Sequence, residues 1–174
     1  MAGPASNDPV EQHRQQAPKS VRCAILTVSD TRDLDSDTSG QAIVDFLEWA
    51  GHQVAAREIL ADEPAAISKV VRELADRSDV DVMLITGCTG IAARDQTPEA
   101  IANLLTKELP GYGELLRMLS YREIGTAAMM SRAAGGLVDQ TVVLTMPGST
   151  PAVRLAMEEV ILPELEHLVS LARS

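Results

Sequence analysis

The chain has 174 residues, of which 45% are hydrophobic and only 2% aromatic, so it can bury one core made mainly of Leu, Ile, Val, Ala and Met. Acidic residues outnumber basic ones by 25 to 15, and the net charge of −10 excludes a general nucleic-acid binder. An anionic substrate would have to be held by local amides, a few Arg side chains and a divalent cation.

The first 20 residues are polar and contain three prolines, and they predict a mobile N-terminal arm. The alternative is an arm that orders against a neighbouring subunit. After this arm, apolar runs alternate with helical periodicity. The predicted elements of this half are strands at Val21–Val28, Val54–Leu60 and Val80–Ile85, with helices at Gly40–Trp49 and Glu63–Arg77 between them.

The second half continues the alternation, with Pro110 and Gly111 expected to break the chain between two helical runs. The last helix is expected to kink at Pro163. The predicted elements are helices at Pro98–Leu109 and Glu114–Tyr121, a turn or short helix at Ser131–Gly136, a strand at Val142–Met146 and a helix at Ala152–Leu171.

This order predicts an α/β fold in which residues 21–174 form a single domain with a mostly parallel sheet flanked by helices. No apolar run approaches the length of a membrane span, and the N-terminus lacks an apolar signal core. Cys23 and Cys88 are far apart in the sequence and neither is near a histidine, which matches no usual zinc spacing and no disulfide framework. We therefore expect a cytoplasmic protein with reduced thiols and no membrane partner.

Residues 86–99, Thr-Gly-Cys-Thr-Gly-Ile-Ala-Ala-Arg-Asp-Gln-Thr-Pro-Glu, are the most informative stretch. They lead from a buried strand through a loop of small residues into a new helix, with Thr97 suited to the N-cap and Pro98 to the first helical position. A strand, a small-residue loop, a carboxylate and a helix start are the parts of an anion site at the carboxyl edge of an α/β sheet.

Three phosphate-binding or catalytic fingerprints are absent from the sequence: the P-loop, the dinucleotide-binding glycine motif and the nucleophile elbow. Polar residues instead follow the predicted strands, where the ends of parallel strands line one crevice. These residues are Ser29, Asp30 and Thr31 after the first strand, Asp62 after the second, Thr86–Gly90 and Asp95 after the third, and Gly148, Ser149 and Thr150 after the last.

From Val21 onward the chain resembles the MoaB/Mog family of molybdenum cofactor biosynthesis proteins. The resemblance covers roughly 150 residues as an ordered set of motifs, and His-Arg-x-x-Ala-Pro in the arm looks like the MoaB branch. The other motifs are Thr-Val-Ser-Asp (27–30), Asp-Thr-Ser-Gly (37–40), Arg-Asp-x-Thr-Pro-Glu-Ala (94–100), Pro-Gly-Tyr-Gly-Glu (110–114), Met-Leu-Ser-Tyr (118–121), Met-Ser-Arg-Ala (130–133) and Met-Pro-Gly-Ser (146–149).

The resemblance implies the three-layer molybdopterin-binding fold and adenylyl transfer, in which molybdopterin and ATP give adenylylated molybdopterin and pyrophosphate with Mg²⁺. The two aspartates that active family members use match Asp62 and Asp95 here. Carboxylates are suitable Mg²⁺ ligands, and the cation offsets the charge of two reacting phosphates. The alternatives are an N-cap role for Asp62 and an Asx-type turn for Asp95.

The polar strand ends predict a substrate-binding wall, and the resemblance adds Ser120 and Ser131 to it as residues near the pterin phosphate. Its residues are Ser29, Asp30, Gly87, Cys88, Thr89, Gly90, Ser120, Ser131, Gly148 and Ser149. Each serine has a local capping or turn alternative, and the glycines could form a simple tight turn. Arg94, Arg132 and Arg154 either pair with phosphates or are solvated.

Cys88 departs from the family pattern, which usually has Gly at this position of the loop. A side chain there costs strain or space if the backbone needs a positive φ. A nucleophilic or redox cysteine is an alternative, although no base or second thiol accompanies it.

Two functions remain open from the sequence: a molybdopterin adenylyltransferase, or a non-catalytic molybdopterin-binding or scaffold protein of the same fold. The resemblance implies a trimer or hexamer and a molybdenum-insertion protein as a further partner. Leu115–Met130, rich in Met and Leu, is either a contact surface between subunits or part of the core.

Overall fold

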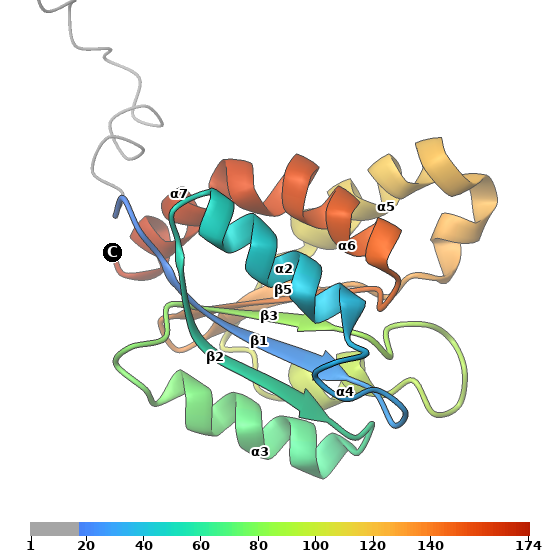
Figure 1. The fold of residues 1–174 in the computed structure, drawn as a ribbon, viewed down its shortest axis with the longest axis horizontal. Coiled ribbons are helices and arrows are strands. Elements are labelled where there is room, and N and C mark those ends of the chain that lie inside the picture. Colours follow the sequence, from blue (N-terminus) through green and yellow to red (C-terminus); the bar gives the residue numbers. More distant parts are fainter. Residues whose placement is uncertain (1–17) are drawn as a thin grey trace, which may run out of the picture.

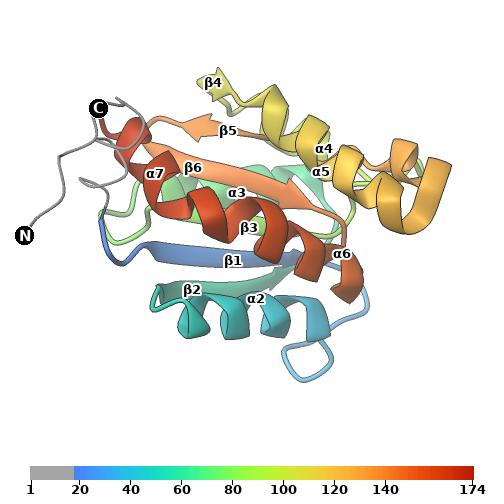
Figure 2. The same ribbon diagram turned by 90° about the horizontal axis from the view of Figure 1, so that it is seen from above.

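A computed structural model describes residues 18–174, and the arm predicted at residues 1–20 therefore lies mostly outside the described residues. The described part contains a six-stranded sheet in the order β2-β1-β3-β6-β5-β4. Figure 2 shows this order from β2 at one edge to β4 at the other. The strands are β1 (Arg22–Val28), β2 (Gln53–Leu60), β3 (Val82–Thr86), β4 (Lys107–Glu108), β5 (Gly135–Val138) and β6 (Thr141–Met146).

Helices cover both faces of the sheet, which confirms the predicted three-layer α/β fold (Figure 1). One face carries α2 (Thr38–Trp49), α5 (Pro110–Ile124) and a C-terminal helical segment; the other carries α3 (Pro64–Ala75) and α4 (Thr97–Ala102). The C-terminal segment consists of α6 (Thr150–Ala156), the π-helical turn η2 (Met157–Ile161) and α7 (Leu162–Ala172).

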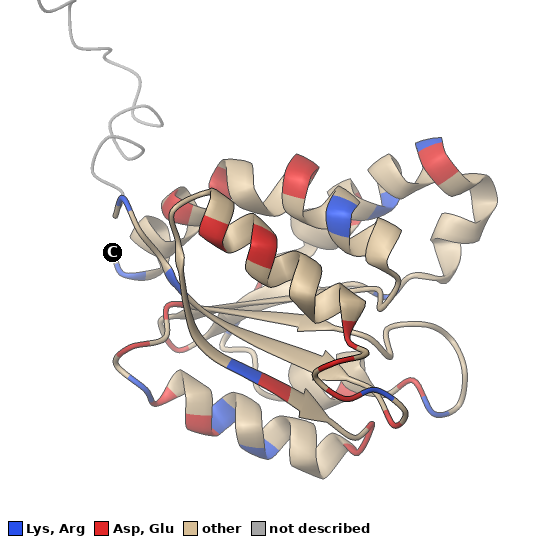
Figure 3. Ribbon diagram, in the orientation of Figure 1, with Lys and Arg blue, Asp and Glu red and all other residues tan. Residues whose placement is uncertain are grey.

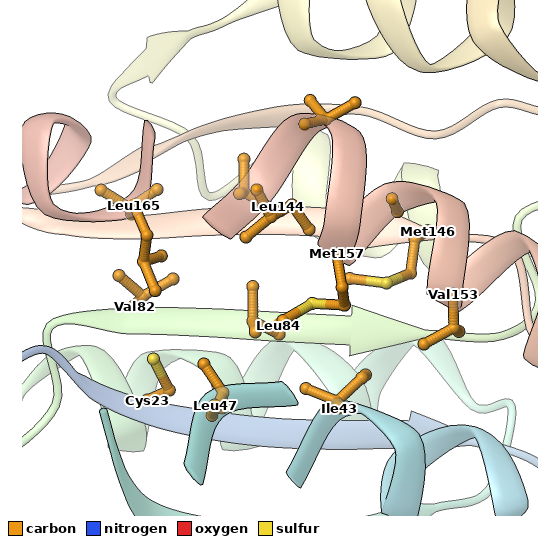
Figure 4. Close-up of a cluster of buried hydrophobic side chains, with 14 of the residues drawn as sticks. Cys23, Ile43, Leu47, Val82, Leu84, Leu144, Met146, Val153, Met157 and Leu165 are labelled. Atoms are coloured by element: carbon orange, nitrogen blue, oxygen red, sulfur yellow. The ribbon is translucent and has the colours of Figure 1, made fainter. Parts of the chain in front are cut away.

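The pleat of the strands divides the core in two. In β1, Cys23 and Ile25 face the layer of α2 and α6, whereas Ala24 and Leu26 face the layer of α3 and α4. With almost no aromatic residues available, branched and sulfur-containing side chains fill the space. Figure 4 shows Met146 and Met157 packed beside Leu84 between the sheet and the helices.

Strands β2, β1, β3 and β6 are parallel, and β5 and β4 add an antiparallel edge. The mostly parallel sheet is thus confirmed. The chain leaves β1 on one side to reach β2 and crosses to the other side to reach β3, so the strand order reverses between β1 and β3. The crevice outside such a reversal is where open α/β sheets bind ligands.

Several predicted element boundaries in the second half were wrong. The predicted turn or short helix at Ser131–Gly136 is partly strand β5, whose glycines allow close neighbours: a Cβ on Gly136 would lie 2.4 Å from the Lys107 carbonyl oxygen. The helix predicted to reach Leu109 ends at Ala102, because Lys107 and Glu108 pair with β5. The sequence pattern alone did not reveal this edge pairing.

Two predicted proline effects also differ in the structure. Pro110 begins α5 instead of breaking the chain, since its missing N–H is not needed in the first helical turn. The irregularity in the last helix is the π turn that precedes α7, which places Pro163 in the first turn of a new helical segment. The N-cap of α4 is Gln96, one residue before the predicted Thr97.

The segment Leu115–Met130 is divided between core and surface. Leu116 of α5 is 1% exposed, whereas Tyr121 and Ile124 are exposed, as is Met129 in the 3-10 helix η1 (Gly125–Met130). The end of α5 and η1 project beyond the end of the sheet (Figures 1 and 2). Among the described residues, no helix is both long enough and apolar enough to cross a membrane.

Candidate functional site

The candidate site lies at the carboxyl ends of the parallel strands, where their arrowheads point to one side in Figure 1. Four loops meet there, after β1, β2, β3 and β6. The backbones approach closely, since a Cβ on Gly148 would lie 3.0 Å from the Cα of Gly87. Acidic and basic positions both occur along these loops (Figure 3). The convergence of polar strand ends that the sequence predicts is therefore present.

Asp62 is the most unusual side chain at this edge. It lies between β2 and α3 and is only 4% exposed. Its Oδ1 is buried and has no hydrogen-bond partner. The N-cap alternative is wrong, because Glu63 occupies the N-cap position of α3 and makes no side-chain capping bond. A buried carboxylate oxygen without a partner is costly, and a cation is a natural compensation.

Asp62 lies beside the loop that follows β3. One carboxylate oxygen of Asp62, the Sγ of Cys88 and one carboxylate oxygen of Asp95 all lie within 4.8 Å of one another. Asp30 supports this cluster, since its Oδ1 accepts a hydrogen bond from the Asp62 backbone N–H at 3.2 Å. The Nε of Arg94 lies 2.8 Å from the other Asp30 oxygen. Asp30 thus positions Asp62.

Asp95 has a structural role as well as a place in the cluster. Its Oδ2 accepts a hydrogen bond from the Ala92 N–H at 2.9 Å and so closes the loop. This bond runs back along the chain, unlike the Asx turn considered from the sequence, which runs forward. A Cβ on Gly90 would lie 2.8 Å from the same oxygen, so a larger residue there would have to displace the Asp95 carboxylate.

The small-residue loop has the backbone geometry that requires glycine. Gly87 has φ of 106°, and a Cβ there would lie 2.3 Å from the Val28 carbonyl oxygen. Cys88 also has a positive φ, of 50°, so its side chain is held at some backbone cost. Its thiol is 3.6 Å from the Val28 carbonyl oxygen, to which it donates.

The surroundings of Cys88 do not favour a nucleophile. Burial, followed by the nearby Asp62 carboxylate and the charges of Asp95 and Asp30, raises the pKa of the Cys88 thiol to about 12. Reactive cysteines have lowered pKa values in electropositive surroundings. The nucleophilic alternative is therefore disfavoured for the metal-free protein.

Arg132 braces the loop from the segment after η1. Its backbone N–H donates to the Thr89 carbonyl at 2.8 Å and its Nε donates to the Gly90 carbonyl at 2.6 Å. The guanidinium also contacts the Asp95 carbonyl and the Glu99 carboxylate. The Arg132 side chain is thus occupied by the loop itself, a role that differs from both alternatives considered from the sequence.

The predicted serines separate into different environments. Ser120 is buried in α5, where its hydroxyl donates to the Leu116 carbonyl at 2.8 Å, which is a local role. Ser29 Oγ accepts hydrogen bonds from the N–H groups of Thr31 and Arg32, as in a tight turn. Ser149 is the N-cap residue of α6, but its side chain makes no capping bond and is exposed.

Ser131 lies next to Arg132, and its Oγ accepts from the Ala133 N–H at 3.4 Å. The carbonyl of Gly148 accepts hydrogen bonds from Ser39 Oγ at 2.7 Å and from Arg32 Nη1 at 3.2 Å. Ser131 and Gly148 therefore lie in loops next to the cluster, with no hydrogen bond to its three donors among the described residues.

A second buried aspartate, Asp37, was not among the predicted site residues. It accepts hydrogen bonds from Thr27 Oγ1 at 2.8 Å and from the Gly40 N–H at 2.9 Å, and Arg57 Nη2 lies 3.3 Å from it. The sequence signal for Asp37 is the Asp-Thr-Ser-Gly motif (37–40) at the start of a helix, where Asp is a favoured N-cap residue. Asp37 holds the loop after β1 against β2.

Two shallow hollows flank the cluster and share Ala93 and Gln96. They provide room for a ligand on either side of the loop after β3. The first is lined by Asp62, Glu63, Pro64, Ala93, Arg94 and Gln96, and the second by Ile91, Ala92, Ala93, Asp95, Gln96, Glu99 and Arg132.

Comparisons with known proteins agree on one family. A family model described as a probable molybdopterin binding domain matches residues 24–167. The molybdenum cofactor biosynthesis protein B of Halalkalibacterium halodurans is 52% identical over 161 residues, which are 92% of this chain and 95% of that protein. The protein of the same name from Bacillus subtilis has the same identity and the same coverage of each chain.

Solved structures extend the similarity to the fold. A crystal structure of a molybdenum cofactor biosynthesis protein B superposes with a TM-score of 0.88 at 51% identity, covering 91% of this chain and 99% of that one. The tungsten cofactor synthesizing protein MoaB from Pyrococcus furiosus superposes with a TM-score of 0.81 at 34% identity, covering 91% and 100% of the two chains.

Proposed function

We propose, from the premise that this chain belongs to the MoaB/Mog family of molybdopterin-binding domains, that it transfers the adenylyl group of ATP to molybdopterin. It is a protein of molybdenum cofactor biosynthesis, as its relatives named molybdenum cofactor biosynthesis protein B indicate. The adenylyl transfer itself is the proposal.

The observation that carries the proposal is the Asp62 carboxylate. Its buried Oδ1 has no partner, and Asp95 offers a second carboxylate within 4.8 Å at the same sheet edge. Mg²⁺ is commonly held by one or two carboxylates, with waters and substrate phosphates completing its coordination. The two aspartates therefore fit the cation that the family resemblance implies.

The reaction requires two phosphates to approach each other. An oxygen of the molybdopterin phosphate attacks the α-phosphorus of ATP, a new P–O–P linkage forms, and the bond to the β-phosphate breaks as pyrophosphate leaves. Mg²⁺ held by Asp62 and Asp95 would neutralise part of the charge of the two reacting phosphates and of the leaving pyrophosphate. Asp62 and Asp95 would keep the cation at the strand ends, and the small residues of the loop after β3 let a ligand approach the backbone.

The test is release of pyrophosphate from ATP in the presence of molybdopterin and Mg²⁺. Asp62→Asn and Asp95→Asn should each abolish most of the release while molybdopterin still binds. Asp139→Asn is the matched control: this exposed aspartate has φ of 54°, a conformation that asparagine tolerates, in the turn between β5 and β6. Failure of the unmodified protein to release pyrophosphate at saturating Mg²⁺ and substrates would overturn the proposal.

The other function considered from the sequence is a non-catalytic molybdopterin-binding or scaffold protein. The observation in its favour is Cys88, whose side chain occupies a loop position with positive φ beside the two carboxylates. Binding of molybdopterin without pyrophosphate release from the wild-type protein or from Cys88→Gly would support this second function. Recovery of release in Cys88→Gly alone would show that the cysteine blocks turnover.

We also propose that the chain forms a homo-oligomer through the projecting surface of α5 and η1. Met118, Tyr121, Ile124 and Met129 are each at least half exposed there, and such a group of apolar side chains is typical of a contact between proteins. Sedimentation or scattering measurements give the mass in solution. A monomer at micromolar concentration would contradict the trimer or hexamer that the resemblance implies.

A further inference from the structure

The loop after β3 contributes a thiol to the carboxylate cluster, and this feature has no place in the proposed adenylyl transfer. The Cys88 Sγ lies within 4.8 Å of a ligand oxygen of both Asp62 and Asp95. Asp62 comes from the loop after β2, whereas the other two residues belong to the loop between β3 and α4. Three donor atoms of the kind that bind metals therefore converge on one point.

A second and independent observation marks this point as a ligand site. Asp62 is more than nine-tenths buried, and its Oδ1 has no hydrogen-bond partner. The other buried aspartates of the described residues, Asp37 and Asp81, each accept hydrogen bonds from an arginine or a backbone N–H. The Asp62 carboxylate interacts with the Cys88 thiol, but its Oδ1 is left with bonding capacity that a cation would use.

The spacing of the donor atoms suits a small cation after modest side-chain rotation. Zinc bonds of about 2.3 Å to sulfur and about 2.0–2.2 Å to oxygen place two ligands of a tetrahedral site about 3.6 Å apart. The three donors lie within 4.8 Å of one another, so a contraction of at most about 1.2 Å brings them to this distance. Three protein ligands leave a fourth position open, as in catalytic zinc sites.

The chemistry of the donors selects the metal. Mg²⁺ prefers oxygen ligands, whereas thiolate sulfur favours softer cations such as Zn²⁺, Co²⁺ and Cd²⁺. Asp30 lies beside Asp62 and adds a further carboxylate, which is paired with Arg94. When such a cation binds, it replaces the thiol proton, which passes to solvent, and the metal–sulfur bond forms.

We propose that Asp62, Cys88 and Asp95 together bind a thiophilic divalent cation, with Zn²⁺ as the representative ion, more tightly than they bind Mg²⁺. The site shares its two carboxylates with the proposed function but depends only on the geometry of the three donors. Binding of Zn²⁺ there and binding of Mg²⁺ exclude each other, so a thiophilic metal would displace the cation required for adenylyl transfer.

The experiment uses the full chain with reduced thiols, freed of metal by a chelator, and contains neither ATP nor molybdopterin. Co²⁺ serves as the spectroscopic probe, because coordination by a thiolate produces a charge-transfer absorption in the near ultraviolet that carboxylate ligands do not produce. Addition of Zn²⁺ should remove this band. Calorimetric titration then gives the affinities for Zn²⁺ and Mg²⁺.

Two variants and one matched control locate the site. Cys88→Gly removes the sulfur at a position where φ of 50° suits glycine, and Asp62→Asn removes the buried carboxylate. Cys23→Ala removes the other cysteine, which is buried in the core away from the cluster. The Co²⁺ band should persist in Cys23→Ala and vanish in Cys88→Gly, with Zn²⁺ affinity lower by about tenfold or more in both site variants.

The proposal is overturned if the wild-type protein shows no thiolate band, if the band survives in Cys88→Gly, or if Zn²⁺ binds no more tightly than Mg²⁺. Because no substrate is present, these outcomes are independent of pyrophosphate release. If the protein is inactive but shows the Cys88-dependent band, the metal site stands and the adenylyl-transfer proposal fails. If the protein is active but shows no band, only the metal site is contradicted.

Discussion

Asp37 and Asp62 are two buried aspartates at the same edge of the sheet, and they differ in their partners. Asp37 is 1% exposed and accepts hydrogen bonds from a threonine hydroxyl and a backbone N–H beside an arginine. Asp62 is 4% exposed and has one oxygen with no partner. A satisfied buried carboxylate holds the fold together, whereas one left unsatisfied indicates a site for a ligand.

The largest expected effect tests the functional side of this comparison. Asp62→Asn should lower the rate of pyrophosphate release by about 10²–10³-fold, because a neutral amide cannot hold the cation that offsets the transition-state charge. The free energy of unfolding should stay within about 1 kcal/mol of wild type or increase, since an unpaired buried charge is removed. Steady-state kinetics measure the rate of pyrophosphate release, and urea unfolding measures the stability. A large loss of stability would place Asp62 in the same structural class as Asp37.

The converse effect is expected at Asp37. Asp37→Asn should lower the free energy of unfolding by about 3 kcal/mol, because the Arg57 cation and the hydrogen bonds at the start of α2 lose their anionic partner. Urea unfolding measures the loss. If Asp37→Asn were as stable as wild type while activity disappeared, the distinction between the two aspartates would fail.

The next largest loss of stability is expected in the turn at Gly87, which brings the cluster together. Gly87→Ala should cost about 2 kcal/mol or more, because φ of 106° is strained for alanine and its Cβ would meet the Val28 carbonyl. Gly111→Ala is the control, since its Cβ would meet no atom within 4 Å. Thermal unfolding of the two variants measures the difference, and equal stabilities would mean that the loop relaxes without cost.

Asp81 is a third buried aspartate, at the opposite end of the sheet, and its contribution to stability should depend on pH. Burial tends to raise the pKa of Asp81, but hydrogen bonds and charge from Arg22 and Arg173 outweigh it and leave the pKa below its ordinary value. A carboxyl with a lowered folded pKa stabilises the protein above its unfolded pKa, and that stability is lost as pH falls through the folded pKa.

Stability should therefore decrease as pH falls below about 4, the ordinary pKa of an aspartate. Asp81→Asn should lower stability near neutral pH and flatten this part of the pH dependence. Urea midpoints measured across the acidic range check the sign. An unchanged slope in Asp81→Asn would assign the acid sensitivity to other carboxyls.

The smallest expected effect concerns Cys88. Cys88→Gly removes the strain of a side chain at a positive φ but increases the entropy of the unfolded chain. The net effect should be an increase of about 0.5 kcal/mol in the free energy of unfolding. Thermal unfolding in the absence of metal measures it. With Zn²⁺ present the wild-type protein should be more stable than Cys88→Gly, because the bound ion stabilises only the wild-type site. A Zn²⁺-independent difference would contradict the metal site.

Much of the fold was predictable from local pattern. The runs of β1, β3 and β6 are apolar because both faces are covered, and the helical spacing of Ile67, Val71 and Leu74 marks the buried side of α3. Strand β5 was missed because its two glycines carry no periodic signal. Its pairing with β4 depends on a neighbour more than 25 residues away in the chain.

The candidate site was predictable to a similar degree. Asp62 and Asp95 were expected from the resemblance, and the structure places their carboxylates together. Asp37 and the bracing role of Arg132 were missed, because each depends on partners in loops distant in sequence. Ser120 donates a hydrogen bond within its own helix, a local contact that a motif match does not reveal, and its place at the substrate stays a prediction.

The sequence by itself determined the alternation of strands and helices, the polar strand ends and the family motifs, because periodicity and turn residues act within a few positions. Only the tertiary structure decided that Cys88 belongs with Asp62 and Asp95, since that meeting depends on the order of β2, β1 and β3 and on the path of two loops. The two cysteines match no metal-binding spacing in the sequence, yet one of them lies in a three-donor cluster. Distance along the chain does not measure distance in the fold, because parallel strands bring their ends to one edge whatever their separation.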